Sequence, residues 1–184
     1  MRILGISGSL RRGSHNRRLL QAASTLLAPG VELVEWDNIA GIPAFDEDLE
    51  TTPPEPVLEF FRAIEEADAL LIATPEYNAS LPGALKNALD WASRPFPENV
   101  LRHKPAAVIG ASTGLFGAVW AQAELRKSLR HTGAHVLDDE LPVGLAGHAF
   151  TPSGRLADAE LDRRLADVLA SLSREVEAPL ELAS

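Results

Sequence analysis

The sequence predicts an α/β domain in which helices cover both faces of a parallel β-sheet. Strand-like and helix-like segments alternate along the chain, and two strand-like segments, residues 69–73 and 106–110, are almost continuously apolar. Such runs are typical of parallel strands that helices bury on both faces. A chain of 184 residues with 46% hydrophobic and 23% charged residues is long enough for one complete core and short for two. We therefore expect residues 1–184 to form a single domain.

Four elements are expected in the first half of the chain. In order, they are a strand at residues 2–7, a helix at 16–27, a strand at 31–36 and a helix that carries Val57, Phe60 and Ile64. Apolar residues recur at helical spacing in both helices. The second strand alternates apolar and polar residues, which predicts a position at or near a sheet edge. Thr52, Pro53 and Glu55 resemble an N-cap, a first-turn proline and a capping-box acid for the second helix.

Six elements are expected in the second half. In order, they are buried strand 69–73, helix 82–91, buried strand 106–110, helix 118–130 ending at Gly133, short strand 135–137 and a last helix with an apolar stripe from Leu161 to Val176. Five strands alternating with helices imply right-handed crossovers, and parallel sheets bind ligands beyond the carboxyl ends of their strands. The loops after the first, third and fourth strands are therefore the expected site. Residues 37–55 form one irregular insertion, and long irregular segments of this kind are often binding elements.

The loop after the first strand, residues 8–16, is suited to holding a phosphate. It joins a buried strand to a helix N-terminus, where free backbone N–H groups and the helix dipole favour an anion. Hydroxyl and amide side chains add hydrogen bonds, and Arg11 adds a fixed cationic fork. The loop lacks the Lys-Ser/Thr pair of a Walker A motif and is not Gly-x-Gly-x-x-Gly, which disfavours nucleoside triphosphate hydrolysis. A turn that only caps the helix is the alternative.

The loops after the third and fourth strands offer groups for a flat heterocycle. Residues 74–83 combine stiffening prolines with Tyr77, whose ring can cover such a ligand; the alternative is a rigid turn with Tyr77 as a surface aromatic. Glycines in residues 111–118 let backbone N–H groups approach a ligand closely. Together the three loops provide a phosphate cradle, a ring cover and a contact for the ring edge.

These motifs resemble those of the NAD(P)H-dependent FMN reductases of flavodoxin-like fold, a family that includes quinone, chromate and azo-dye reductases. The resemblance rests on Gly8-Ser9-Leu10-Arg11, Pro75-Glu76-Tyr77-Asn78, residues 82–91 and Ser112-Thr113-Gly114. It implies a three-layer flavodoxin-like sandwich with strand order 2-1-3-4-5 and non-covalently bound FMN. The residues that it assigns are Ser9, Arg11, Ser14 and Asn16 to the FMN phosphate, Pro75, Glu76, Tyr77 and Asn78 to the ribityl chain and isoalloxazine, and Ser112, Thr113 and Gly114 to the ring edge.

The resemblance also implies the reaction. NADPH or NADH would reduce the flavin by hydride transfer, and a quinone or similar small-molecule acceptor would then reoxidise it in a ping-pong cycle. Because the flavin carries this chemistry, no catalytic acid or base side chain is expected. Family members are commonly dimers or tetramers in which a neighbour's loop similar to residues 43–49 can approach the flavin. The chain departs from the family pattern at Phe45, where tyrosine is expected, and at Ala118, where a second glycine is frequent.

Two other functions are compatible with parts of the sequence. A flavodoxin-like electron carrier or flavin-binding module would share the fold and the cofactor but would not use nicotinamide. A serine hydrolase is suggested by residues 110–114, which fit Gly-x-Ser-x-Gly around Ser112, with Asp138, Asp139 and His148 following in order. Against the hydrolase, the chain is short, it lacks a His-Gly-Gly-Gly-like segment, and the first loop would have no role.

Composition and spacing argue against several other classes. A net charge of −9 opposes binding to nucleic acid, and the absence of cysteine excludes disulfides, thiolate metal sites and cysteine nucleophiles. No metal site is expected, because Gly133 interrupts any helix that would align His131 with His135. The sequence enters a strand directly and has no apolar run long enough to cross a bilayer. We therefore expect a cytoplasmic protein without a membrane or nucleic-acid partner.

Overall fold

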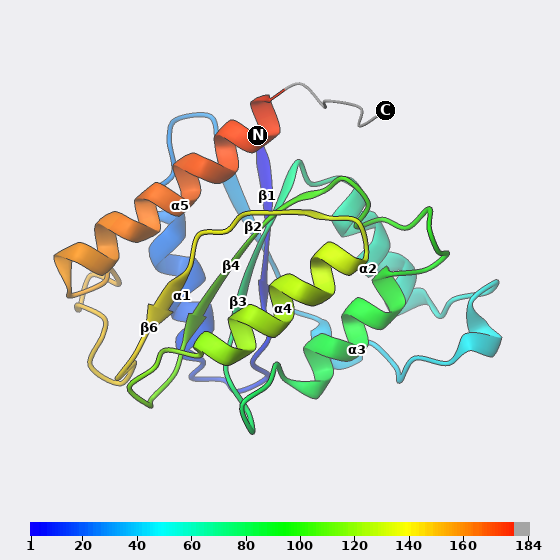
Figure 1. Ribbon diagram of the computed structural model, residues 1–184, viewed down its shortest axis with the longest axis horizontal. Helices are drawn as coiled ribbons and strands as arrows, with labels where there is room; N and C mark the ends of the chain where they lie inside the picture. The colour runs from blue at the N-terminus through cyan, green and yellow to red at the C-terminus, as the bar shows by residue number, and fades with distance from the viewer. Residues whose placement is uncertain (179–184) are drawn as a thin grey trace.

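The computed structural model describes residues 1–178 and contains a six-stranded parallel sheet (Figure 1). The strands are β1 (Arg2–Ser7), β2 (Glu32–Trp36), β3 (Ala69–Thr74), β4 (Pro105–Ala111), β5 (His135–Val136) and β6 (Leu141–Val143). Their order is β2-β1-β3-β4-β5, and β6 also pairs with β4. The predicted order is confirmed, with β2 at an edge and β3 and β4 at the centre.

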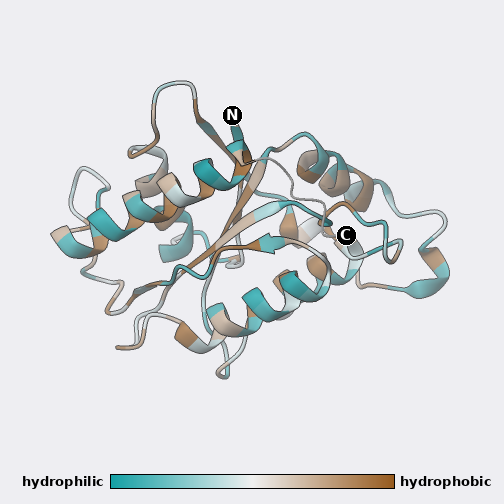
Figure 2. Cartoon of the chain, turned by 45° about the horizontal axis from the view of Figure 1, so that its top comes forward, coloured by the Kyte–Doolittle hydropathy of each residue, from teal (hydrophilic) through white to brown (hydrophobic). Residues whose placement is uncertain are grey.

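Helices cover the sheet on both sides and complete the three predicted layers. They are α1 (His15–Ser24), α2 (Glu55–Glu65), α3 (Gly83–Ala92), α4 (Val119–His131) and α5 (Ala159–Glu177), with short 3₁₀ helices η1 (Ile39–Gly41) and η2 (Glu47–Leu49). One buried cluster joins α1 and α5 to the sheet, and the other joins α2, α3 and α4 to its opposite face. Figure 2 shows the apolar strands between helices that carry apolar residues on one side and polar residues on the other. Among the described residues, no helix is both long and apolar enough to span a membrane.

The sixth strand corrects the prediction of five. β5 pairs only with Pro105 and Ala106 of β4, whereas β6 pairs with residues 109–111. Between them lie Asp138, Asp139 and Glu140, and acidic residues disfavour strand structure. One edge position of the sheet is therefore shared by two short strands.

Two predicted helix ends are also wrong. The second helix begins at Glu55 with Pro54 at its N-cap, and no side chain caps it, so Thr52 is not the N-cap. The reason is that Pro54 holds Pro53 out of the α region, which keeps the chain extended up to the helix. The first helix ends at Ser24 and not at residue 27. Thr25 is its C-cap, and the Thr25 hydroxyl donates to the Ala22 carbonyl at 2.8 Å.

The irregular insertion docks on α3 through side chains of that helix. Asn87 accepts a hydrogen bond from the N–H of Phe45 at 2.7 Å and donates to the carbonyl of Pro43 at 2.8 Å. The indole N–H of Trp91 donates to the same carbonyl at 2.9 Å, and the Phe45 ring packs edge-on against Trp91. Trp91 and Leu89 are buried, so both residues belong to the core.

Candidate functional site

A cavity of about 200 Å³ opens where the loops after β1, β3 and β4 meet, at the predicted edge of the sheet. The residues that line it are Ser9, Arg11, His15, Asn16, Pro75, Glu76, Tyr77, Ala111, Ser112 and Thr113. The structure thus brings together every predicted site residue except Ser14, Asn78 and Gly114. His15 and Ala111 line the cavity without having been predicted.

The first loop provides hydrogen-bond donors at the N-terminus of α1. Ser14 is buried and caps the helix, because its hydroxyl oxygen accepts from the N–H of Arg17 at 3.2 Å. Within residues 1–178, the N–H groups of Gly13, His15 and Asn16 meet no protein acceptor. Together with the helix dipole, these groups make this end of the cavity favourable for an anion.

Arg11 and Ser9 complete the anion-binding end. The Arg11 guanidinium donates to the carbonyl of Gly13 at 2.8 Å, which holds it over the turn. The Ser9 hydroxyl oxygen accepts from the N–H of Arg11 at 3.4 Å, so its own proton stays available for a ligand. A fixed cation and a hydroxyl donor therefore lie beside the free N–H groups.

Asn16 has a second role that the sequence did not reveal, since it continues the sheet. The β3–β4 ladder ends at the Thr74–Gly110 pair, and the next residue, Ala111, bonds to the buried Asn16 side chain. The amide donates to the Ala111 carbonyl at 3.0 Å, and its oxygen accepts from the Ala111 N–H at 2.9 Å. Asn16 thus ties the first loop to the start of the third, and one amide hydrogen is left for a ligand.

The second loop is a tight hairpin. Tyr77 and Ser80 exchange two backbone hydrogen bonds of 3.0 and 3.1 Å, and both residues between them, Asn78 and Ala79, have positive φ. This geometry is that of a two-residue turn of type I′. It holds the half-exposed Tyr77 ring at the rim of the cavity, while Asn78 lies at the tip and does not line it.

Glu76 joins the second loop to α4. Its carboxylate accepts hydrogen bonds from the N–H groups of Trp120 and Ala121 at 3.1 and 3.2 Å. The N-cap of α4, Ala118, has φ +63° and no capping side chain, so Glu76 supplies the cap from another loop. The left-handed backbone at Ala118 also explains why glycine is expected there.

Gly117 fixes the shape of the third loop. Its φ is +57°, and a Cβ placed there would lie 2.4 Å from the carbonyl carbon of Pro142. The loop therefore rests directly on β6, the strand that sequence analysis missed. Ser112 and Thr113 reach the cavity, whereas Gly114 is set back from it, and its N–H donates to the Ser112 hydroxyl at 3.2 Å.

His15 is the functional candidate that sequence analysis passed over. Its ring lines the cavity and lies parallel to the Phe150 ring, with the centroids 6.5 Å apart. Burial lowers its pKa, and the positive charges of Arg11 and Arg18 lower it further. His15 lies between Ser14 and Asn16 at the first residue of a helix, and this position in the sequence could have identified it as a candidate site residue.

The residues proposed for a serine hydrolase do not form a catalytic triad in the structure. Among the described residues, no histidine is hydrogen bonded to the Ser112 hydroxyl, whose partner is the N–H of Gly114. Asp138 is paired with Arg130 at 2.5 Å. Residues 1–178 also contain no group of three side chains suited to hold a metal ion.

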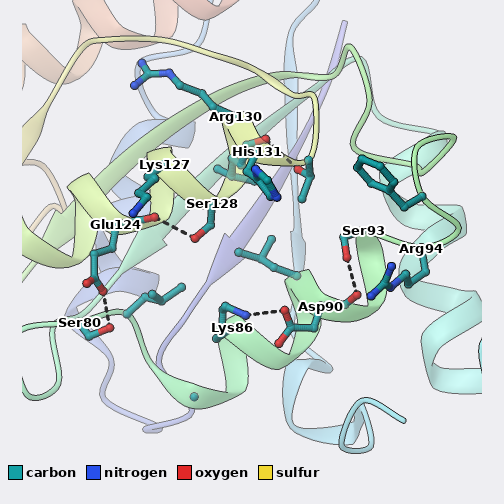
Figure 3. Close-up of a pocket in the computed structure, with 16 residues that line it drawn as sticks. Ser80, Lys86, Asp90, Ser93, Arg94, Glu124, Lys127, Ser128, Arg130 and His131 are labelled. Atoms are coloured by element: carbon teal, nitrogen blue, oxygen red, sulfur yellow. Dashed lines mark hydrogen bonds and ion pairs between the residues drawn. The ribbon is translucent and has the colours of Figure 1, made fainter. Parts of the chain in front are cut away.

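A larger cavity, of about 1060 Å³, lies between α3 and α4 (Figure 3). Among the residues that line it, Lys86 pairs with Asp90 at 2.5 Å, and the Ser80 hydroxyl donates to Glu124. The Phe96 side chain at its edge is 63% exposed. Ser80 brings the second loop to this cavity, but the N-terminal turn of α1 with its free N–H groups lines only the smaller one.

Several large apolar side chains on the third loop, the start of α4 and the loop after β6 are exposed. Leu115, Phe116 and Leu145 are exposed, and Trp120 is 49% exposed and packs edge-on against Phe116 at 5.2 Å. Trp120 is therefore a surface residue.

Comparisons with known proteins agree on one family. The model of the NADPH-dependent FMN reductase family matches residues 1–148. An NAD(P)H-dependent FMN reductase of Pseudomonas aeruginosa is 49% identical over 160 residues, covering 86% of this chain and 85% of that protein. An NAD(P)H:quinone oxidoreductase of Solanum tuberosum is 41% identical over 94% of this chain and 91% of that protein. The structure of FerB, a flavoenzyme NAD(P)H:acceptor oxidoreductase of Paracoccus denitrificans, aligns with a TM-score of 0.84 and 35% identity, covering 96% of this chain and 97% of that one.

Proposed function

Since this chain belongs to the NADPH-dependent FMN reductase family, we propose that it holds FMN in the cavity between its first, second and third loops. It is an FMN-dependent oxidoreductase that takes reducing equivalents from NADPH or NADH and passes them to quinones or similar small acceptors. FMN, when bound, supplies the hydride chemistry, and a ping-pong order follows if donor and acceptor use one face of the ring in turn. The protein then needs to bind and orient three molecules and to exclude unwanted reactions.

The phosphate belongs at the N-terminus of α1. Free N–H groups there, the Arg11 guanidinium and the Ser9 hydroxyl supply donors to an anion. Ser14 and Asn16 act mainly by holding this turn, because their side chains already cap α1 and bond to Ala111. The single observation that carries the proposal is the meeting of these donors with the two other predicted loops at one cavity.

The flavin ring belongs beside the second and third loops. Tyr77, on its tight hairpin, lies against the ring, and Pro75 stiffens the chain next to it. Ser112, Thr113 and Gly114 offer backbone groups to the ring edge. Glu76 is occupied as the cap of α4, so we assign it to holding the second and third loops together; Asn78 at the hairpin tip is the more exposed candidate.

We also propose a homodimer or homotetramer with the flavin near the subunit interface. The cavity of about 200 Å³ is smaller than the roughly 300–1,000 Å³ of common ligand pockets, so part of the ring must extend past it. Leu115, Phe116 and Trp120, on the third loop and the first turn of α4, are exposed, and a second subunit would cover them. Size-exclusion chromatography with light scattering tests the oligomer; a monomer at micromolar concentration would contradict it.

The main test starts with FMN binding. Purified protein is titrated into FMN, and we expect quenching of flavin fluorescence that Arg11→Gln weakens by about tenfold. Arg12→Gln, an exposed neighbour that does not line the cavity, is the control and should bind normally. Absence of quenching with the unmodified protein refutes the proposed site.

Turnover separates the reductase from the electron carrier. The loaded protein is mixed with NADPH or NADH and a quinone, and oxidation of the nicotinamide is followed by its absorbance. Without oxygen, a reductase consumes about one equivalent of nicotinamide per bound flavin and turns over continuously only when the quinone is added, whereas a carrier without nicotinamide activity does not consume it. A cytoplasmic location and a single domain stay predictions, which cell fractionation and limited proteolysis address.

A further inference from the structure

His15 is a histidine in the anion-binding end of the cavity that the proposed function leaves without a role. It is the first residue of α1 and lies next to the Ser14 cap and the Asn16 bridge. The Phe150 ring lies parallel to the imidazole, with the two centroids 6.5 Å apart. The ring thus occupies a set position among groups that attract an anion.

The two ring nitrogens differ in their surroundings. Nδ1 is enclosed and has no hydrogen-bond partner among residues 1–178. Nε2 is not enclosed in this way, so it is the nitrogen that a molecule in the cavity can reach. A buried polar atom without a partner is uncommon in folded proteins and calls for an explanation.

The charges around His15 favour the neutral ring while no anion is present. Arg11 from the first loop and Arg18 from the next turn of α1 both act to lower its pKa, in addition to burial. The other titratable groups lining the cavity are Glu76 and Tyr77, and the Glu76 carboxylate is engaged by α4. On the segment that carries Phe150, Arg155 is paired with Asp162.

A phosphate monoester reverses this balance, since it carries between one and two negative charges at neutral pH. An opposite charge at hydrogen-bond distance favours the protonated imidazole. We infer that His15 is a ligand of the cofactor phosphate: in the empty site the ring is neutral with its proton on Nδ1, and Nε2 takes up a proton from water and donates it in a hydrogen bond to the phosphate when the phosphate binds. The inference rests on the proposed FMN site, and it makes retention of FMN stronger as the pH falls from 8 to 6.

The experiment compares FMN with riboflavin, which differ only in the phosphate. Binding to wild type and His15→Phe is measured by fluorescence quenching between pH 6 and 8. The Phe variant keeps a ring against Phe150. His148→Asn, an exposed histidine outside the cavity, is the matched control. Calorimetry in two buffers of different ionisation enthalpy counts the protons taken up with each flavin.

We expect wild type to bind FMN about tenfold more tightly than His15→Phe at pH 6, with a smaller ratio at pH 8, because one proton is linked to binding. The phosphate itself titrates near pH 6, but it does so in the wild type and in the variant alike. The wild type should therefore take up more protons per FMN than the variant, and the difference is the contribution of His15. Riboflavin should bind to both equally and without this difference, and His148→Asn should behave as wild type.

Other outcomes overturn the inference in distinguishable ways. Equal FMN affinities and equal proton counts mean that His15 does not contact the phosphate, and the proposed FMN site survives. Weaker FMN binding without a change in proton count rejects the proton uptake. Equal loss of riboflavin affinity means that His15 supports the ring or the fold instead. If wild type binds neither flavin, the proposed function itself fails.

Discussion

Replacement of Asn16 tests whether one side chain extends the sheet and joins two of the three loops. In Asn16→Ala, two hydrogen bonds of 3.0 and 2.9 Å are lost, and the N–H and carbonyl of Ala111 lose these partners. A neutral hydrogen bond contributes roughly 1 kcal/mol net, and a buried group left unpaired costs about 1–3 kcal/mol. We therefore expect the free energy of unfolding to fall by about 2–4 kcal/mol.

The assay is equilibrium unfolding in urea, followed by far-UV circular dichroism. Gln21→Ala, which removes an exposed amide side chain from the same helix, is the control and should change the free energy by less than about 0.5 kcal/mol. Asn16→Asp provides a second variant, because it keeps the acceptor for the Ala111 N–H but places a carboxylate against the Ala111 carbonyl. A loss in Asn16→Ala no larger than that of the control would refute the structural role of this residue.

Three further predictions follow from the backbone and from His15. Gly117→Ala should lower stability by several kcal/mol and weaken FMN binding, since its Cβ would overlap the backbone of Pro142; Gly13→Ala, with open space around it, should unfold with a midpoint close to that of wild type. Ala79→Gly should stabilise the protein by about 1 kcal/mol in urea unfolding, because alanine is strained at φ +60°; an unchanged midpoint would argue against strain. Without flavin, the lowered pKa of His15 means that the unfolded chain binds more protons as the pH falls below about 6.5. Stability should therefore drop between pH 7 and 5, and it should drop less in His15→Phe; parallel pH curves for the two proteins would contradict this.

Patterns in the sequence predict the layers, and the resemblance to the family predicts the strand order; the structure confirms both, and the position of the site stays a prediction. Continuous apolar runs identify β3 and β4 because both faces of those strands are buried, and the alternating pattern of residues 31–36 identifies an edge strand. The rule that parallel sheets bind ligands at their carboxyl ends then selects three loops. These signals are strong because each depends on many residues or on topology.

The features that the sequence did not reveal depend on single long-range contacts. Asn16 bonds to Ala111 because the β3–β4 ladder ends one residue earlier. Glu76 caps α4, a helix more than forty residues away whose own N-cap lacks a capping side chain. β6 has only three residues and contains a proline, so its periodicity is too short to recognise. The cap at Thr52 was predicted from a local pattern that consecutive prolines override.

The cross-connections among the loops divide the residues around the site into two groups. Glu76 and Asn16 each hold a loop other than their own, so a substitution at either one disturbs distant parts of the flavin site at once. Leu115, Phe116 and Trp120 have exposed side chains, and the Phe116 and Trp120 rings pack edge-on against each other. A laboratory selection for new electron acceptors should therefore gather its changes at these three positions, where the choice of substrate can diversify while the grip on the cofactor is preserved.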